Sequence, residues 1–235
     1  MGMQDRTPGW YGKLPTLGDF ASRRLEPSFI EPWDTWLATG LAGLRERASD
    51  TWLEHYLSSP VWRFVLMPGV ILPDTAMAGV LMPSVDRVGR YFPLTIAAPM
   101  PSLPTSSHGL DALQTWLYQL DDVAADALHE DWDIEHLDQV LARFPLPDWG
   151  DAPPMGSQAL RDVMQGTQPS QMLGVDSRQA LQDLLAYSAA TQWQKQAQGL
   201  AFWWADALDG PPRNLVSHGL PADTGFAALM GPAAP

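Results

Sequence analysis

The residues best suited to chemistry stand together in one short polar stretch between two apolar runs. Ser84, Asp86, Arg87 and Arg90 fall within seven consecutive positions. An arginine guanidinium presents a fork of donors that fits an anion or a partner's carboxylate, and neighbouring Asp and Ser side chains can orient it. One hypothesis is therefore a binding site for an anion or a partner. The alternative is that Asp86 pairs with one of the arginines, and Ser84 caps a turn, only to hold a hairpin together.

The flanking sequence predicts how this stretch is positioned. Apolar runs at 77–82 and 92–98, bounded by Pro and Gly, predict two buried strands. Pro83 and Pro93 restrict φ near the two strand junctions, and Gly89 can adopt positive φ between them. We therefore expect a rigid turn that aims its side chains.

Further apolar patterns predict a layered α/β domain. The run at 62–67 adds a third strand to an antiparallel meander, and 199–205 and the aromatic segment 9–20 add further strand character. Apolar residues recur at helical spacing before and after the meander, and these helices must cover its faces. The predicted helices lie at 28–44, 52–57, 113–130, 158–165, 178–197 and 222–230. We expect one domain over residues 1–235.

The composition indicates a folded protein with a large interior or a partner-facing surface. Hydrophobic residues make up 46% and charged residues 17%, and eleven residues are tryptophan. The absence of cysteine excludes disulfides, thiolate zinc sites and cysteine nucleophiles. The sequence shows neither a secretory leader nor an apolar run of membrane-spanning length, so we expect a cytoplasmic protein without membrane insertion.

The negative charge is concentrated in the second part of the chain. The net charge is −13, and residues 101–235 carry 5 basic against 17 acidic residues. Such a surface repels phosphate backbones, so we expect no nucleic acid partner. No Lys or Arg occurs from 111 to 138, where carboxylates recur. This acidic helical region can be a solvated face, a cation site or a surface for a basic partner.

No catalytic motif is present in the sequence. Phosphate-binding glycine loops, the Gly-x-Ser-x-Gly elbow and paired-His metal motifs are all missing. Asp19 and Asp86 could form a carboxylate pair, and His218 could act as a base, but no spacing brings them together. We therefore expect no catalytic residue, no metal and no cofactor.

Two ordered groups of residues resemble the TagF family of type VI secretion-associated proteins. The resemblance covers most of residues 9–97 and two short patches, Phe202 to Trp204 and Gly219 to Pro221. The first group is Gly12, Lys13, Leu14, Pro15, Gly18, Asp19 and Phe20, and the second is Ser84, Asp86, Gly89, Arg90, Tyr91, Phe92 and Pro93. Each piece alone is weak, whereas the ordered set is specific.

This resemblance implies a fold and a role. The fold is a three-layer αβα sandwich with a mixed, largely antiparallel central sheet. The role is that of a cytoplasmic accessory protein, not an enzyme, which represses type VI secretion after translation through the forkhead-associated scaffold protein of that apparatus. The candidate partner-binding residues are Lys13, Asp19, Ser84, Asp86, Arg87 and Arg90.

Other readings of the same residues stay open. The six candidates can hold the fold together while a partner binds elsewhere, for instance on the acidic helix. The chain can also be a structural subunit of the apparatus that buries a tryptophan-rich surface. A third hypothesis is a hydrolase that acts on phosphate or acyl groups through Asp19 or Asp86. The oligomeric state is not predicted.

Overall fold

One antiparallel sheet of seven strands organises the structure, a computed structural model that describes residues 6–150, 152–206 and 211–231. The strand order is β2-β1-β5-β4-β3-β6-β7. The strands are β1 (Gly9–Gly12), β2 (Ala21–Arg23), β3 (Trp62–Leu66), β4 (Ala76–Met82), β5 (Leu94–Met100), β6 (Leu200–Ala205) and β7 (Arg213–His218). The predicted α/β class is confirmed.

The predicted meander is confirmed, whereas the expected mixed sheet is wrong for the described strands. β3, β4 and β5 are consecutive neighbours, and every strand pair in the sheet is antiparallel. β5 begins later than predicted because Phe92 donates its N–H to Ser84 instead of to the ladder, and Pro93 has no N–H to donate. The sequence analysis missed β2 and β7, the two edge strands.

Two compact units make up the chain, and each is described by itself. Unit 1 comprises residues 1–102, 115–147 and 198–235, and unit 2 comprises residues 103–114 and 148–197. The expected single domain over residues 1–235 stays a prediction.

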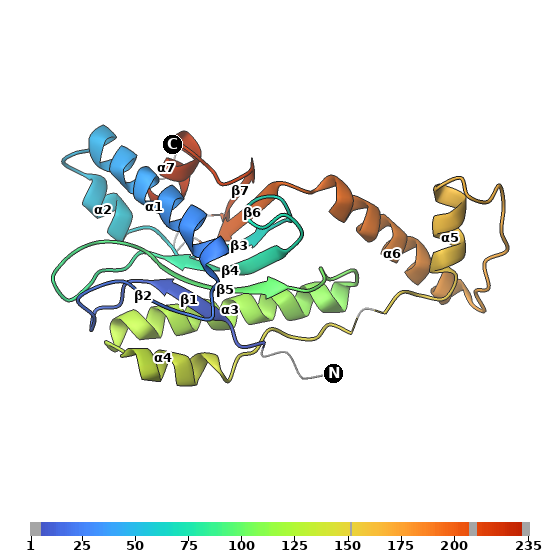
Figure 1. Ribbon diagram of the computed structural model, residues 1–235, viewed down its shortest axis with the longest axis horizontal. Coiled ribbons are helices and arrows are strands. Elements are labelled where there is room, and N and C mark those ends of the chain that lie inside the picture. Colours follow the sequence, from blue (N-terminus) through green and yellow to red (C-terminus); the bar gives the residue numbers. More distant parts are fainter. Residues whose placement is uncertain (1–5, 151, 207–210, 232–235) are drawn as a thin grey trace. The chain divides into compact units, whose positions relative to one another are not determined.

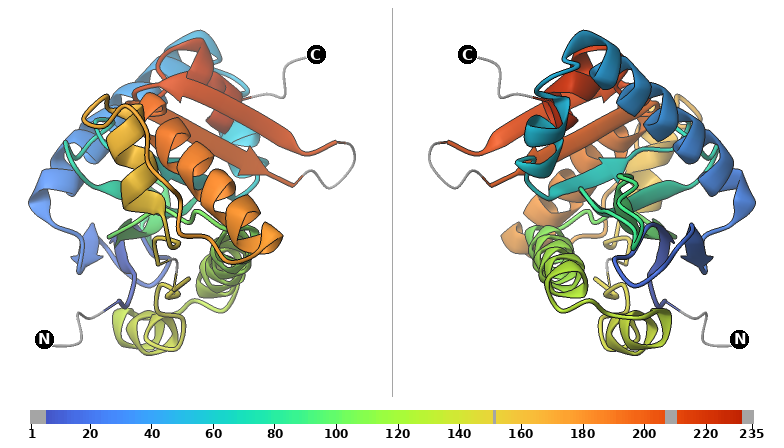
Figure 2. Two further views of the ribbon diagram at one scale, coloured as in Figure 1. Left: turned by 90° about the vertical axis from the view of Figure 1, so that its right-hand side faces the viewer. Right: turned by 90° about the vertical axis from the view of Figure 1, so that its left-hand side faces the viewer.

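In unit 1, helices lie against both faces of the sheet (Figures 1 and 2). α1 (Pro27–Arg47), α2 (Trp52–Leu57) and α7 (Thr224–Met230) contribute to the core on one face. α4 (Ile134–Leu141) and the part of α3 (Ser107–His129) that belongs to unit 1 lie at the other face. The central strands β4 and β5 are accordingly buried almost throughout, which explains their continuous apolar sequences.

Aromatic side chains fill the core under α1. Trp33 stacks on Phe29 and contacts Trp203, while Trp36 meets the ring of Phe226 edge-on at 5.2 Å. The indole of Trp33 also donates to the hydroxyl of Thr95 at 2.8 Å. Seven of the eleven tryptophans are buried and Trp193 alone is exposed. The hypothesis of a tryptophan-rich surface is therefore wrong, because these rings build the core.

The acidic region at 111–138 is not one uninterrupted helix. α3 ends at His129, and α4 begins after Asp133, whose carboxylate accepts the N–H of His136 at 2.8 Å as an N-cap. Asp121 pairs with the buried Arg63, and Asp138 pairs with Arg24 at 2.9 Å. These two carboxylates hold unit 1 together, so the region is more than a solvated helix face.

Unit 2 contains the predicted helices near 158–165 and 178–197, here α5 (Ser157–Met164) and α6 (Arg178–Gln196). Only Leu184 of α6 is buried. Of the helices described in either unit, none combines the length and the apolar character needed to span a bilayer.

Candidate partner-binding surface

The turn between β4 and β5 is closed by its own backbone. Val85 and Tyr91 form an isolated antiparallel bridge, and the N–H of Asp86 donates to the carbonyl of Arg90 at 3.1 Å. Gly89 adopts φ of 81°, the left-handed conformation that the sequence predicted for it. Backbone hydrogen bonds alone therefore fix the conformation of the turn.

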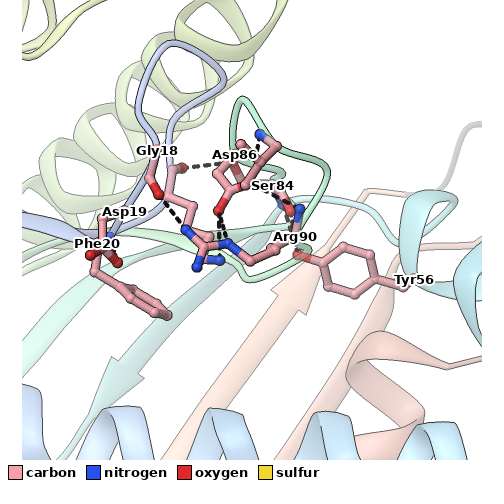
Figure 3. A network of polar contacts seen from close by, with 9 residues as sticks. Gly18, Asp19, Phe20, Tyr56, Ser84, Asp86 and Arg90 are labelled. Atoms are coloured by element: carbon pink, nitrogen blue, oxygen red, sulfur yellow. Dashed lines mark hydrogen bonds and ion pairs between the residues drawn. The ribbon is translucent and has the colours of Figure 1, made fainter.

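The carboxylate of Asp86 is the centre of the turn (Figure 3). It accepts four hydrogen bonds: Lys13 Nζ at 2.8 Å, Arg90 Nε at 2.7 Å, and the backbone N–H groups of Val88 at 3.0 Å and Arg90 at 2.9 Å. Its side chain is fully buried. The expected pairing of Asp86 with an arginine is confirmed, with Lys13 as a second partner that the sequence did not reveal.

Burial and hydrogen bonding act in opposite directions on this carboxyl group. Burial alone raises the pKa of Asp86, whereas the hydrogen bonds from Lys13, Arg90 and Val88 lower it, and the net result is a pKa well below the usual range. Asp86 is thus ionised and its acceptor sites are occupied. This geometry suits an anchor better than a nucleophile or base, which would need a free and accessible oxygen.

Lys13 and Ser84 belong to the same buried network. The hydroxyl of Ser84 donates to the carbonyl of Lys13 at 2.7 Å, and the phenol of Tyr56 exchanges hydrogen bonds with the Ser84 backbone at 2.8 and 2.9 Å. Gly12, at the end of β1, allows the chain to lie close to the backbone of Pro93, because a Cβ at position 12 would overlap the carbonyl oxygen of Pro93. Lys13 and Ser84 are 3% and 2% exposed, so neither is available to a partner.

The other three candidates are exposed. The guanidinium of Arg90 lies between Asp86 and the carbonyl of Gly18, with 52% of its side chain exposed (Figure 3). Arg87 is fixed through its backbone N–H, which donates to Leu17 at 2.9 Å, while its guanidinium has no hydrogen bond or ion pair with the described residues. Asp19 accepts the N–H of Phe20 at 2.9 Å and makes no ion pair with either arginine.

A groove beside the turn was missed by the sequence analysis. It has a volume of about 590 Å³. It is lined by Lys13, Phe20, Asp34, Ala38, Leu41, Arg45, Gly89, Arg90, Tyr91 and Phe92. α1 forms one side, with Arg45 lying over the ring of Trp52 at 4.5 Å. The helical periodicity places Arg45 outside the apolar stripe but says nothing about the turn that faces it. We call this depression the basic groove.

The described residues contain no group of three or more His, Asp or Glu side chains placed to hold a metal ion. The acidic run at 111–138 instead uses Asp121 and Asp138 in ion pairs, while Asp122, Asp126 and Glu130 lie exposed.

Comparison with known proteins places these features in a family context. The model of the TagF N-terminal domain, described as type VI secretion system-associated, matches residues 9–144. The crystal structure of PA0076 from Pseudomonas aeruginosa PAO1, at 2.05 Å resolution, is 30% identical and covers 97% of each chain with a TM-score of 0.69. No curated protein matches the sequence.

Proposed function

Because the chain belongs to the TagF N-terminal domain family, we propose that it restrains type VI secretion after translation by binding the forkhead-associated scaffold protein of the apparatus. The observation that carries this proposal is the family match over residues 9–144, which contains all six candidate residues. The protein acts in the cytoplasm as a binding module, without catalysis or cofactor. Unit 1 forms the three-layer αβα sandwich, a description supported by central strands that are buried on both faces.

The six candidate residues have two different roles in the proposed binding. Lys13, Ser84 and Asp86 form the buried support, while Asp19, Arg87 and Arg90 offer the exposed contacts. A surface that is already rigid loses little conformational entropy when a partner docks, so more of the contact energy appears as affinity. The hydrogen bonds that Arg90 donates to the Asp86 carboxylate and to the Gly18 carbonyl restrain it in this way.

Arg87 offers the cleanest test, since its exposed guanidinium makes no hydrogen bond or ion pair with the described residues whose loss would disturb the fold. We expect the full chain to bind the purified scaffold protein, and Arg87→Glu to weaken that binding by at least about tenfold, as measured by calorimetry. In cells, excess wild-type chain should reduce release of type VI substrates, and Arg87→Glu should not.

Arg47→Glu is the matched control, because Arg47 is exposed on α1 and its contacts with Asp223 are long: an ion pair at 4.0 Å and a hydrogen bond to the carbonyl at 3.4 Å. It should bind as the wild type does. Failure of the wild-type chain to bind the scaffold, or unchanged substrate release in its presence, would overturn the proposed function.

A second candidate function is that of an assembly subunit, and the surface of unit 2 favours it. Unit 2 exposes apolar side chains, among them Met155, Met172 and Leu185, with exposed fractions of 70%, 94% and 54%. Such surfaces are typical of proteins that are covered within a larger assembly. Sedimentation of the pure protein as a stable monomer at high concentration would count against this role.

A further inference from the structure

We propose that the basic groove binds an acidic segment of the scaffold protein, one in which a carboxylate stands next to a large apolar side chain. This inference rests on the proposed function and adds the chemistry of recognition. Three features support it: the groove floor, the charges along the groove rim and the charge of the whole chain.

The floor of the basic groove is apolar and already ordered. The ring of Phe20 is 43% exposed, although it stacks on Tyr11 at 5.8 Å and meets Phe92 edge-on at 4.8 Å. Tyr91 contacts Trp52 edge-on at 6.0 Å at the side nearer α2. An exposed aromatic ring whose orientation is fixed by neighbouring rings offers an anchor point for an apolar or aromatic side chain of a partner.

The rim of the groove carries positive charge that the protein itself does not neutralise. Asp86 neutralises Lys13, whereas Asp34, whose carboxylate accepts the neutral hydroxyl of Tyr11, keeps its negative charge in the lining of the groove. Arg45 contacts the face of Trp52 but forms no ion pair with the described residues, and Arg90 shares its single carboxylate with Lys13. Around the groove, three cations (Lys13, Arg45 and Arg90) thus face two carboxylates (Asp34 and Asp86), which leaves an excess of one positive charge.

This local charge is opposite to the charge of the chain. The net charge of −13 repels a long polyanion such as nucleic acid, whereas a short acidic segment feels chiefly the two nearby guanidiniums, because salt screens more distant charges beyond about 10 Å. The guanidinium of Arg45 lies over the ring of Trp52 without an ion pair to the described residues, so its donors are available for a carboxylate. An acidic peptide with an apolar neighbour therefore matches both the rim and the floor.

The first experiment identifies the recognised chemistry without assuming a partner. A random peptide display library is selected on the full wild-type chain and counter-selected on Arg45→Glu. We expect enrichment of Asp or Glu within a few positions of Leu, Phe or Trp. The best peptide should bind Arg45→Glu at least about tenfold more weakly, and wild type more weakly as salt rises from about 50 to 300 mM.

Arg47→Glu again serves as the matched control, since it makes the same charge change two residues away on α1 outside the basic groove. It should retain the peptide affinity. Enrichment of basic or purely apolar peptides, absence of enrichment, or equal losses in Arg45→Glu and Arg47→Glu would each overturn the inference.

The second experiment separates this inference from the proposed function. The purified scaffold is titrated into wild type, Arg45→Glu and Arg47→Glu, with folding checked by circular dichroism. If only Arg45→Glu loses binding, the result supports both the proposed function and the groove as the binding site. If wild type and both variants bind equally, the proposed function stands and the groove is rejected as the scaffold's site. Absence of binding to the folded wild type rejects the proposed function.

Discussion

Replacement of Asp86 by Asn tests whether the buried network holds the turn. The asparagine oxygen can still accept the N–H groups of Val88 and Arg90, but its amide group would face the donors of Lys13 and Arg90. Lys13 would be left as a buried, unpaired ammonium whose side chain is 4% exposed. Removal of one partner from a buried ion pair costs about 3–5 kcal/mol. Because the two backbone hydrogen bonds survive, we expect a loss at the lower end, about 3 kcal/mol.

The matched control is the more exposed ion pair between Arg24 and Asp138. Each of these side chains is 27% exposed, so solvent screens the attraction and Asp138→Asn should cost only about 1 kcal/mol. The free energy of unfolding is measured by urea titration with tryptophan fluorescence, since most of the tryptophans lie in the core of unit 1.

A double variant makes the test independent of any general effect of the substitution. Lys13→Met combined with Asp86→Asn removes both buried charges, so the combined loss should fall short of the sum of the single losses by about 2 kcal/mol. A loss below about 1 kcal/mol in Asp86→Asn, or strict additivity in the double variant, would refute the assignment of this network as a buried anchor.

The remaining predictions concern the stability of the fold. Because hydrogen bonds hold the pKa of Asp86 below that of the unfolded chain, about 3.9, its stabilisation is complete above about pH 5 and is lost as the pH falls. As the pH falls from about 7 to about 3, the free energy of unfolding measured in urea should decrease by about 1 kcal/mol less in Asp86→Asn than in wild type, and equal decreases would contradict this origin. On α1, Gly43→Ala should stabilise by about 0.5–1 kcal/mol because the new Cβ meets only the flexible guanidinium of Arg47 at 3.2 Å. Gly40→Ala should destabilise by about 1–3 kcal/mol because its Cβ would overlap the ring of Phe226, and thermal unfolding that ranks the two variants oppositely would disprove this packing.

The elements predicted correctly from the sequence are those with a continuous or strongly periodic apolar pattern. β4 is buried on both faces, so the whole run from Ala76 to Leu81 is apolar and needs no partner to be recognised. β7 packs on one side only, and half-buried residues alternate with exposed ones along it. Because polar Asn214 and Ser217 are among them, its sequence resembles that of a turn. α4 was missed because its carboxylates continue the acidic pattern of α3 across the break at Asp131, which adopts positive φ.

The candidate site was predictable only where its contacts are local. Asp86 and Arg90 are four residues apart, and Asp19 binds the backbone of the next residue, so both interactions could be inferred from spacing. Lys13 reaches Asp86 from 73 positions away, and this contact depends on the register of β1 against β5. Arg45 faces the turn only because α1 packs across the sheet. No local pattern encodes either arrangement.

The sheet order also fixes when the core can close during synthesis of the chain. β3 pairs with β4 on one side and with β6 on the other, yet β6 begins only at Leu200, far beyond the end of β5 at Met100. At ribosomal speeds of about 5–20 residues per second, that gap lasts roughly 5–20 s. Throughout this interval, the nascent protein carries an unpaired strand edge beside Trp33 and Trp36, which later pack on Trp203. Closure of this edge therefore depends on β6, a strand that lies outside residues 9–144, the segment that the family model matches.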